Sequence, residues 1–270
     1  MSAVLWEPGY RGGMCQVLEY GIPFMRQDIL IIIPAYNEAE ALGTCVEGLC
    51  RDVSGADVLV VNDGSIDDTA RIAEALAVRL PAVRVLHLPL NSGIGAAVQS
   101  GLIYAARNGY AAAIQYDGDG QHDARFIPAM LAAVHDQQLD LVIGTRFLDM
   151  EGDAFKSTFM RRIGIRFFSF LIGMLTGVKV TDPTSGFRVY GRRAVEFFAR
   201  HYPDDYPEPE ALFWCVRNGL RVGEVAVRMR ERQGGVSSIR YFRTAYYMIK
   251  VTLAILVDRL RAREVVDDEG

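Results

Sequence analysis

Two short apolar runs separated by a helical pattern do most to limit the folds open to this chain. Ile29–Ile33 and Val58–Val61 contain no polar residue, which is typical of strands buried on both faces of a parallel sheet. The segment between them, Glu38–Arg51, has the apolar spacing of a helix. Strands that alternate with helices form right-handed β-α-β units, so we expect an α/β fold with a doubly wound, mainly parallel sheet.

The same alternation continues along the first half of the chain, and we take Pro34 as the end of the first strand. We predict three further strands there, over residues 83–88, 111–116 and 139–144. The accompanying helices are predicted over residues 67–79, 95–108 and 126–135.

After residue 149 the pattern becomes helical and basic. Here we predict helices over 157–176, 207–218 and 241–263, a loop over 181–190 that runs into a short strand, and a strand over 222–230. We expect an irregular N-terminal extension over 1–26, one domain over 27–240 with helical elements in its C-terminal part, and an amphipathic helix with an acidic tail over 241–270.

Charge and hydropathy restrict the partners. The formal net charge of −4 argues against a nucleic-acid binder, while basic residues concentrate at 156–193 and 221–250 and favour an anionic ligand or a membrane surface. The longest uncharged apolar segment, 167–178, has twelve residues, too few to cross a bilayer. The four cysteines lack metal-site spacing, and no signal peptide is evident, so we expect a cytoplasmic protein.

Polar residues follow three of the predicted strands, at Pro34–Glu38, Asn62–Asp63 and Asp117–Asp119. Ligands bind outside the carboxyl ends of the strands in open α/β sheets. Hard divalent cations such as Mg²⁺ or Mn²⁺ take oxygen ligands, often one or two carboxylates plus substrate phosphates. The two carboxylates of Asp117–Asp119, with Gln121, are therefore candidate metal ligands, although a polar turn would also explain this sequence.

Two common nucleotide-binding patterns are absent from the sequence. No Gly-x-Gly-x-x-Gly follows the first strand, which disfavours hydride transfer, and no P-loop pattern is present. The glycine-containing run Asn91–Gly95 could direct N–H groups at a phosphate, or it could simply begin a helix.

An ordered set of motifs resembles the signature of family 2 inverting glycosyltransferases with the GT-A fold. These motifs are Pro34–Glu38, Asn62–Ser65, Asp117–His122, Gly144–Arg146, Thr181–Arg188 and Arg232–Ser238. The last two resemble the dolichol-phosphate mannose synthase branch, in particular bacterial members that load N-acetylglucosamine or glucose onto undecaprenyl phosphate. The chain departs from that branch at Asn62, where Asp is frequent, and at Ser238, where Lys is frequent.

The resemblance implies a role for individual residues. It implies nucleotide-sugar contacts for Pro34, Tyr36, Glu38, Asp63, Asp117 and Gln121, and metal ligation by Asp117, Asp119 and Gln121. It implies catalytic roles for Asp119, Arg146, Arg188 and Arg232, the arginines acting on phosphates. The candidates for binding the acceptor phosphate are Arg162, Arg166, Ser185 and Ser237.

The implied reaction moves a hexose or N-acetylhexosamine (mannose, glucose or N-acetylglucosamine) onto polyprenyl phosphate, undecaprenyl or dolichyl, with inversion. A phosphate monoester is mostly dianionic at neutral pH, so it needs arginines more than a general base. If the acceptor were instead a saccharide hydroxyl, Glu208 or Glu210 could be that base, or both could be helix N-terminal acids. A further alternative is a catalytically silent nucleotide-sugar-binding subunit.

The expected location is peripheral, at the cytoplasmic face of the membrane. Segment 167–178 and the C-terminal amphipathic helix would lie at the inner leaflet. A small membrane-protein partner is a further candidate, because the sequence contains no span of its own.

Overall fold

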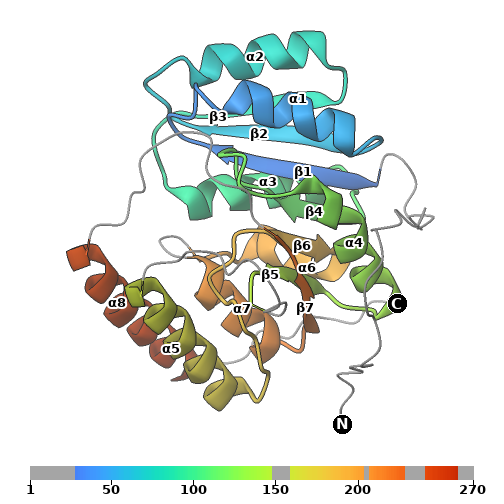
Figure 1. Ribbon diagram of the computed structural model, residues 1–270. Coiled ribbons are helices and arrows are strands. Elements are labelled where there is room, and N and C mark those ends of the chain that lie inside the picture. The colour runs from blue at the N-terminus through green and yellow to red at the C-terminus, as the bar shows by residue number, and fades with distance from the viewer. Residues whose placement is uncertain (1–27, 148–158, 204–206, 229–240, 261–270) are drawn as a thin grey trace, which may run out of the picture.

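The computed structural model describes residues 28–147, 159–203, 207–228 and 241–260. Its described residues form a seven-stranded sheet in the order β3-β2-β1-β4-β6-β5-β7 (Figure 1). The strands are β1 (Ile29–Ala35), β2 (Asp57–Asp63), β3 (Val83–Leu88), β4 (Ala112–Gln115), β5 (Leu141–Thr145), β6 (Arg188–Gly191) and β7 (Val222–Ala226). All pairs are parallel except those of β6, which runs antiparallel to β4 and β5. The predicted mainly parallel sheet is confirmed.

Helices cover both faces of the sheet, as a doubly wound fold requires. Alternate residues of β1 point to opposite faces, so Ile31 packs with one set of helices and Ile32 with the other. The first set is α1 (Leu42–Asp52), α2 (Thr69–Arg79) and α4 (Ile127–Asp136), the last preceded by the 3₁₀ turn η1 (Ala124–Phe126). The second set is α3 (Ile94–Arg107), α6 (Arg192–Arg200) and α7 (Pro207–Arg217).

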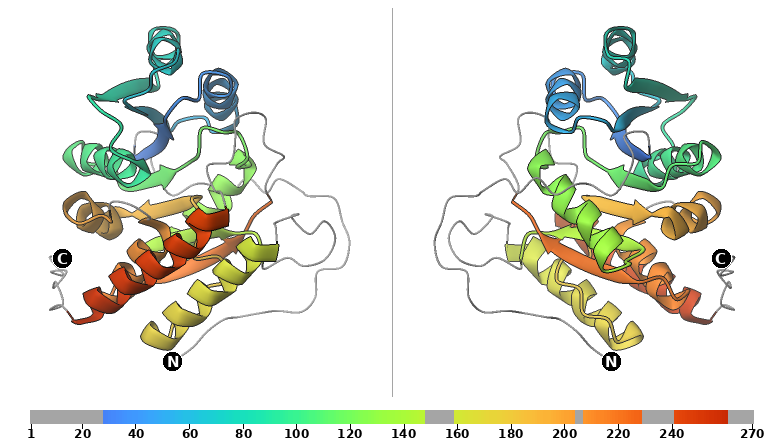
Figure 2. Two further views of the ribbon diagram at one scale, coloured as in Figure 1. Left: turned by 90° about the vertical axis from the view of Figure 1, so that its left-hand side faces the viewer. Right: turned by 90° about the vertical axis from the view of Figure 1, so that its right-hand side faces the viewer.

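Two further helices, α5 (Phe159–Thr176) and α8 (Tyr241–Leu260), lie side by side against α7 (Figures 1 and 2). The three helices share a small apolar cluster made of Phe168, Leu171, Phe213, Val251 and Ile255. An ion pair of 3.1 Å between Arg217 and Asp258 also joins α7 to α8. Among the described residues, no helix has the length and apolar character needed to span a bilayer.

Pro34 lies inside β1, so the prediction that it ends the strand was wrong. The carbonyl oxygen of Ile32 accepts the N–H of Tyr116 at 3.0 Å, so the backbone hydrogen-bonding groups of Ile32 point toward β4. The backbone nitrogen of Pro34, two residues later, points to the same side. It lies beyond the last β1–β4 pair, which joins Ile32 to Gln115. Its missing N–H therefore interrupts no ladder hydrogen bond.

The direction of β6 decides which segment reaches the edge where the parallel strands end. Because β6 runs against β4 and β5, the residues that precede it lie at the carboxyl ends of these neighbours. Arg188, the first residue of β6, is opposite both Gln115 of β4 and Ile143 of β5. Segment 181–187 thereby meets the loops that follow β4 and β5.

Candidate active site

Hydrogen bonds join the loop after β1 to the loop after β2. Asn37 adopts a left-handed conformation with φ of 55°, which asparagine tolerates better than most residues. Its N–H donates to the Ser65 hydroxyl at 3.1 Å, and the N–H of Glu38 donates to the Thr69 hydroxyl at 2.8 Å. Tyr36, a predicted nucleotide contact, keeps 43% of its surface exposed and is available to a ligand.

Asp63, another predicted nucleotide contact, is buried and fastens a neighbouring loop. Its carboxylate accepts the N–H groups of Ser92 at 2.7 Å and Gly93 at 2.9 Å. Gly64 has φ of 64°, and a Cβ there would lie 2.6 Å from the Asn91 nitrogen. The N–H groups at the start of α3 thus bind a carboxylate of the chain itself. Nucleotide contact by Asp63 stays a prediction.

The Asp117–Gln121 loop follows β4 and carries the candidate metal ligands. The Asp117 side chain is one-third exposed, and its Oδ2 lies 3.1 Å from Nε2 of His122. Asp119 Oδ1 accepts the Gln121 N–H at 3.0 Å, which fixes the turn between them. Both carboxylates are therefore held in place before any ligand arrives.

The charge around this loop suits a divalent cation. Burial, and then the negative charge of Asp119, raises the pKa of the Cys45 thiol to about 12. The negative charges of Asp117 and Glu38 also raise that pKa. Negative charge attracts a cation, and oxygen ligands are what Mg²⁺ and Mn²⁺ prefer. In the described part of the chain, no group of three His, Cys, Asp or Glu side chains is placed to hold a metal.

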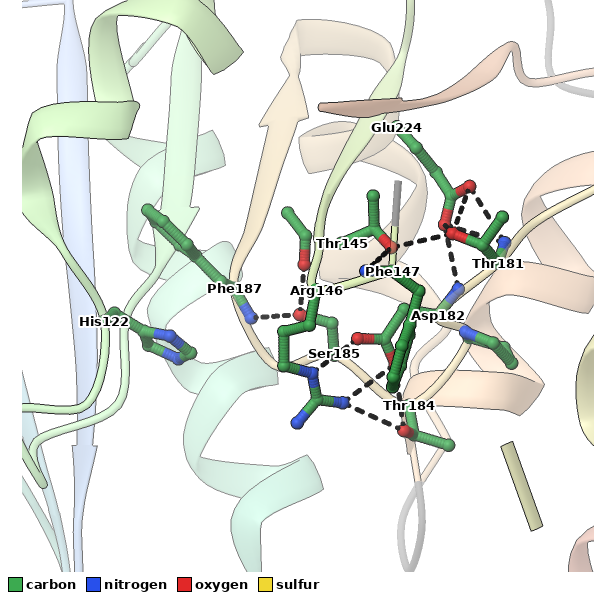
Figure 3. Close-up of polar contacts among 12 residues, drawn as sticks. His122, Thr145, Arg146, Phe147, Thr181, Asp182, Thr184, Ser185, Phe187 and Glu224 are labelled. Carbon is green, nitrogen blue, oxygen red and sulfur yellow. Dashed lines mark hydrogen bonds and ion pairs between the residues drawn. The ribbon is translucent and has the colours of Figure 1, made fainter. Parts of the chain in front are cut away.

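His122 is hydrogen-bonded to the Asp117 carboxylate and is itself packed between aromatic rings. Its ring is buried and is stacked on Phe187 at 4.8 Å between centroids (Figure 3). The ring is also edge-on to Tyr116, at 5.4 Å between centroids. Among the described residues its Nδ1 has no hydrogen-bond partner. A buried N–H without an acceptor costs more than a buried lone pair, so the fitting neutral tautomer donates from Nε2 to Asp117. His122 is thereby an orienting residue for the acidic loop.

The segment that precedes β6 touches the same carboxylate. A Cβ on Gly186 would lie 3.1 and 3.2 Å from the two carboxylate oxygens of Asp117, and 3.4 Å from Nε2 of Gln115. Gln115 is fully buried, and its Nε2 has no hydrogen-bond partner in the described part of the chain. The motifs around Asp117 and Gly186, far apart in sequence, therefore share one site.

Arg146 follows β5 and is held by a bidentate ion pair. Its Nε donates to Asp182 Oδ2 at 2.6 Å and its Nη2 to Asp182 Oδ1 at 2.8 Å (Figure 3). The two side chains keep 3% and 0% of their surface exposed. Thr184 donates to the same Asp182 carboxylate at 3.1 Å. The planar guanidinium is thus fixed in one orientation, and phosphate contact by Arg146 stays a prediction.

Arg188, predicted to bind a phosphate, has no exposed surface. Its guanidinium donates to the carbonyl oxygens of Ser185 at 2.8 Å, Pro183 at 3.0 Å and Glu208 at 2.8 Å. This placement gives Arg188 the task of tying segment 183–185 to the start of α7. Its remaining nitrogen, Nη1, is buried and has no hydrogen-bond partner among the described residues, so phosphate contact by Arg188 stays a prediction.

Ser185, a predicted acceptor-phosphate ligand, is also buried. Its hydroxyl donates to the Gly144 carbonyl at 2.7 Å, which holds the end of β5 against the segment before β6. Arg162 and Arg166 lie on exposed parts of α5. Arg232 and Ser237 lie outside the described residues.

The two candidate bases, Glu208 and Glu210, stand in the first turn of α7. Burial raises the pKa of Glu208; the charge of Arg188 opposes this rise, and the negative charge of Asp117 adds to it. Glu208 therefore lies within electrostatic reach of the Asp117–Gln121 loop, and both Glu208 and Glu210 are partly exposed. The predicted alternatives, base or helix N-terminal acid, both remain for this pair.

Comparison with known proteins agrees with the motifs. Residues 30–198 match the model of the family described as Glycosyl transferase family 2. The chain is 34% identical over 246 residues to polyprenol monophosphomannose synthase of Mycolicibacterium smegmatis, covering 89% of this chain and 92% of that protein. It is 32% identical over 241 residues to undecaprenyl-phosphate mannosyltransferase of Micrococcus luteus, covering 87% and 98%.

Solved structures show the same fold. Glucosyl-3-phosphoglycerate synthase of Mycobacterium tuberculosis, solved in complex with Mn²⁺, UDP and glucosyl-3-phosphoglycerate, superposes with a TM-score of 0.64 at 19% identity. The superposition covers 89% of this chain and 81% of that one. The predicted GT-A fold is confirmed, and the chain belongs to glycosyl transferase family 2 and is a glycosyltransferase.

Proposed function

We propose that this enzyme transfers one sugar residue from a nucleoside diphosphate sugar to the phosphate of a polyprenyl phosphate, with inversion at the anomeric carbon. One observation carries the proposal: the acidic Asp117 loop lies against Gly186, in the same segment whose Asp182 holds Arg146. This arrangement supports a donor site at the Asp117–Gln121 loop and an acceptor phosphate oriented by Arg146. The two relatives, both named for mannosyl transfer to a lipid phosphate, support this acceptor.

The chain's own groups would divide the work. Asp117 and Asp119, with Gln121, would hold a divalent cation, Mg²⁺ or Mn²⁺, which neutralises the diphosphate as it leaves. Tyr36 would contact the nucleoside, together with Pro34, Glu38 and Asp63. Arg146 would orient the acceptor phosphate, with Arg162, Arg166, Arg232 and Ser237 as further candidates. The phosphate oxygen is already ionised and attacks without a general base.

The surface of α5 and α8 suits a lipid acceptor. Ile163, Phe167, Phe170 and Met174 recur at helical spacing on α5 and are all exposed. On α8 the exposed apolar residues Ile249, Leu253, Leu256 and Val257 form a second stripe. The exposed side chains of Arg162 and Arg166 flank the first stripe. Apolar stripes beside basic residues favour an anionic membrane surface, so we propose peripheral binding at the cytoplasmic leaflet.

A transfer assay tests the proposal. Purified protein, Mn²⁺ or Mg²⁺ and undecaprenyl phosphate would be incubated with radiolabelled GDP-mannose, UDP-glucose or UDP-N-acetylglucosamine. We expect one donor to label the lipid fraction, with the anomeric configuration reversed in the product. The Asp119→Asn variant should lose this activity while keeping its fold. If no nucleotide-sugar labels the lipid, polyprenyl phosphate is not the acceptor and the proposal is overturned. A labelled saccharide product would then favour a saccharide acceptor.

The position of Glu208 favours one alternative, transfer to a saccharide hydroxyl. Burial raises the pKa of the Glu208 carboxyl, which makes its carboxylate a stronger base than that of an ordinary glutamate. In that reaction Glu208→Gln should abolish turnover, whereas transfer to an ionised phosphate should survive the same change. Comparing the rates of this variant on the two acceptor classes separates the two functions.

A further inference from the structure

We infer that Glu224, a residue of β7 outside every recognised motif, is a positioning residue of the active site. Its carboxylate fixes the Thr181–Asp182 turn, and Asp182 in turn fixes the Arg146 guanidinium. The inference rests on the proposed function, in which Arg146 orients a phosphate.

The geometry of the carboxylate carries the first step. Glu224 stands opposite Ile143 in the β5–β7 pair, so its side chain lies close to where β5 ends. Its Oε1 accepts the N–H groups of Thr181 and Asp182, both at 2.9 Å, and its Oε2 accepts the Thr181 N–H at 2.8 Å (Figure 3). Two successive backbone amides thus point at one carboxylate. Only a group that accepts hydrogen bonds fits this position.

A chain of hydroxyl groups extends the hold to both neighbours of Arg146. Thr181 donates its hydroxyl to Glu224 at 3.0 Å, because an ionised carboxylate can only accept. The Thr181 oxygen must then accept from Thr145, 2.7 Å away, and the Thr145 oxygen accepts the N–H of Phe147 at 3.3 Å. The directions of all these bonds agree, and the backbone on either side of Arg146 is linked to Glu224.

The consequence for Arg146 follows from burial. Asp182 is fully buried and grips the guanidinium through both oxygens, so a shift of the Thr181–Asp182 turn moves the guanidinium with it. Loss of the Glu224 acceptor would leave the two amides without this partner and favour such a shift. A displacement of about 1 Å at a positioning group can cost about 100-fold in rate.

Substitution of Glu224 tests the inference. Glu224→Ala should lower kcat by about 100-fold and leave the affinity for the Mn²⁺-bound nucleoside diphosphate unchanged. Glu224→Gln should restore part of the rate: its amide oxygen can accept both N–H groups in the place of Oε1, while its amide nitrogen, in the place of Oε2, can no longer accept the Thr181 N–H. Wild-type kcat in Glu224→Ala, or equal losses in the two variants, would overturn the inference.

A matched control separates positioning from general loss of stability. Asp140 makes a comparable contact at the opposite end of β5, where its carboxylate accepts the Arg221 N–H at 2.7 Å. Asp140→Ala should lower the Tm and leave the kcat of the folded enzyme unchanged. A kcat loss as large as that of Glu224→Ala would show that any destabilisation of these strands suffices, and would overturn the inference.

A double variant shows whether Glu224 acts through Arg146. In an Arg146→Ala background, Glu224→Ala should cost less than about twofold, because the group it positions is gone. If Glu224→Ala lowers the rate by the same factor in both backgrounds, Glu224 does not act through Arg146, and the inference is overturned. Amide hydrogen exchange gives a readout independent of turnover: the N–H groups of Thr181 and Asp182 should exchange faster in Glu224→Ala. Unchanged exchange of these two N–H groups would show that Glu224 does not hold the turn, whichever substrate accepts the sugar.

Discussion

Gly186 brings the segment before β6 against Asp117 because it has no side chain. The absent Cβ would meet both oxygens of that carboxylate at 3.1 and 3.2 Å, tighter than ordinary van der Waals contact. Asp117 is itself held by His122, which is packed between Tyr116 and Phe187 and cannot retreat easily. The site therefore tolerates very little added volume at this residue.

Replacement of Gly186 by alanine should lower the reaction rate more than it lowers the stability of the fold. The new methyl group must displace the Asp117 carboxylate by a few tenths of an ångström, and we expect kcat to fall by about tenfold to 100-fold. Initial rates and circular dichroism would measure the two effects. Gly48→Ala in α1 is the control, because its Cβ meets nothing within 4 Å; it should add about 0.5–1 kcal/mol of stability. Full activity in Gly186→Ala would contradict the close approach.

Glu224 also predicts a pH dependence of stability. Burial raises its pKa above the ordinary value of 4.5, although the hydrogen bonds from Thr181 and Asp182 oppose the rise. A raised folded-state pKa gives stability that is present below the unfolded pKa and lost as pH rises through the folded pKa. Glutamine does not titrate, so the free energy of unfolding of Glu224→Gln minus that of the wild type should increase with pH. Urea unfolding from pH 4 upward would measure it, and a falling difference would refute the shift.

At the scale of elements, α5 and α8 are bound to the rest of the molecule by one side only. Phe168 and Ile255 anchor that side against α7, while Phe170 and Leu253 remain 69% and 55% exposed. The opposite side of the two helices is apolar and exposed, and the proposed membrane contact would cover it.

Charged residues on this side should weaken membrane binding. Burying a large apolar side chain contributes about 1.5–3 kcal/mol, so Phe170→Asp and Leu253→Asp should each lower the partition onto anionic vesicles by about tenfold or more. Co-sedimentation with phosphatidylglycerol vesicles would measure this. Val78→Asp in α2 replaces a residue that is 88% exposed on another helix, and it should bind as the wild type does. Equal binding by all three variants would exclude this surface.

Most elements could be predicted from pattern, and the exceptions have physical causes. Helix α3 differs from its predicted bounds by one residue at each end, and α5 ends at the predicted residue, 176. The orientation of β6 could not be predicted, because an alternating strand pattern reads the same in both directions. Helix α6 was missed, although Ala194, Val195, Phe197 and Phe198 have helical spacing and signal it.

At the scale of the whole molecule, ligand binding should be visible as added stability. A ligand at 100 times its Kd stabilises the folded state by about 2.7 kcal/mol, which for a domain of this size raises Tm by about 5–10 °C. We expect Mn²⁺ and a nucleoside diphosphate together to give this rise, and each alone to give less. Thermal unfolding of wild type and Asp119→Asn would measure it. An undiminished rise in the variant would place the metal elsewhere.

The overall fold and the acidic loop could be predicted because both depend on local sequence. Buried runs identify the strands, and Asp117 and Asp119 stand directly after one of them. The pairing of Arg146 with Asp182 and of Arg188 with Glu208 could not be predicted, since these contacts span 36 and 20 residues of chain. For the same reason sequence alone gave Glu224 no role: its partners lie 43 and 42 residues away.

The strand order also sets an order of assembly. Strands β3, β2, β1 and β4 pair only with one another until β6 arrives, and all of them lie within the first 115 residues. Strand β5 is synthesised before β6, yet its two neighbours, β6 and β7, both come later in the chain. During synthesis β1 to β4 can therefore pair as a sheet of their own before either neighbour of β5 has been made. A chain that stops before Arg188 contains the whole Asp117–Gln121 loop but lacks both β6 and Glu224, so nothing in it can hold the Thr181–Asp182 turn as Glu224 does.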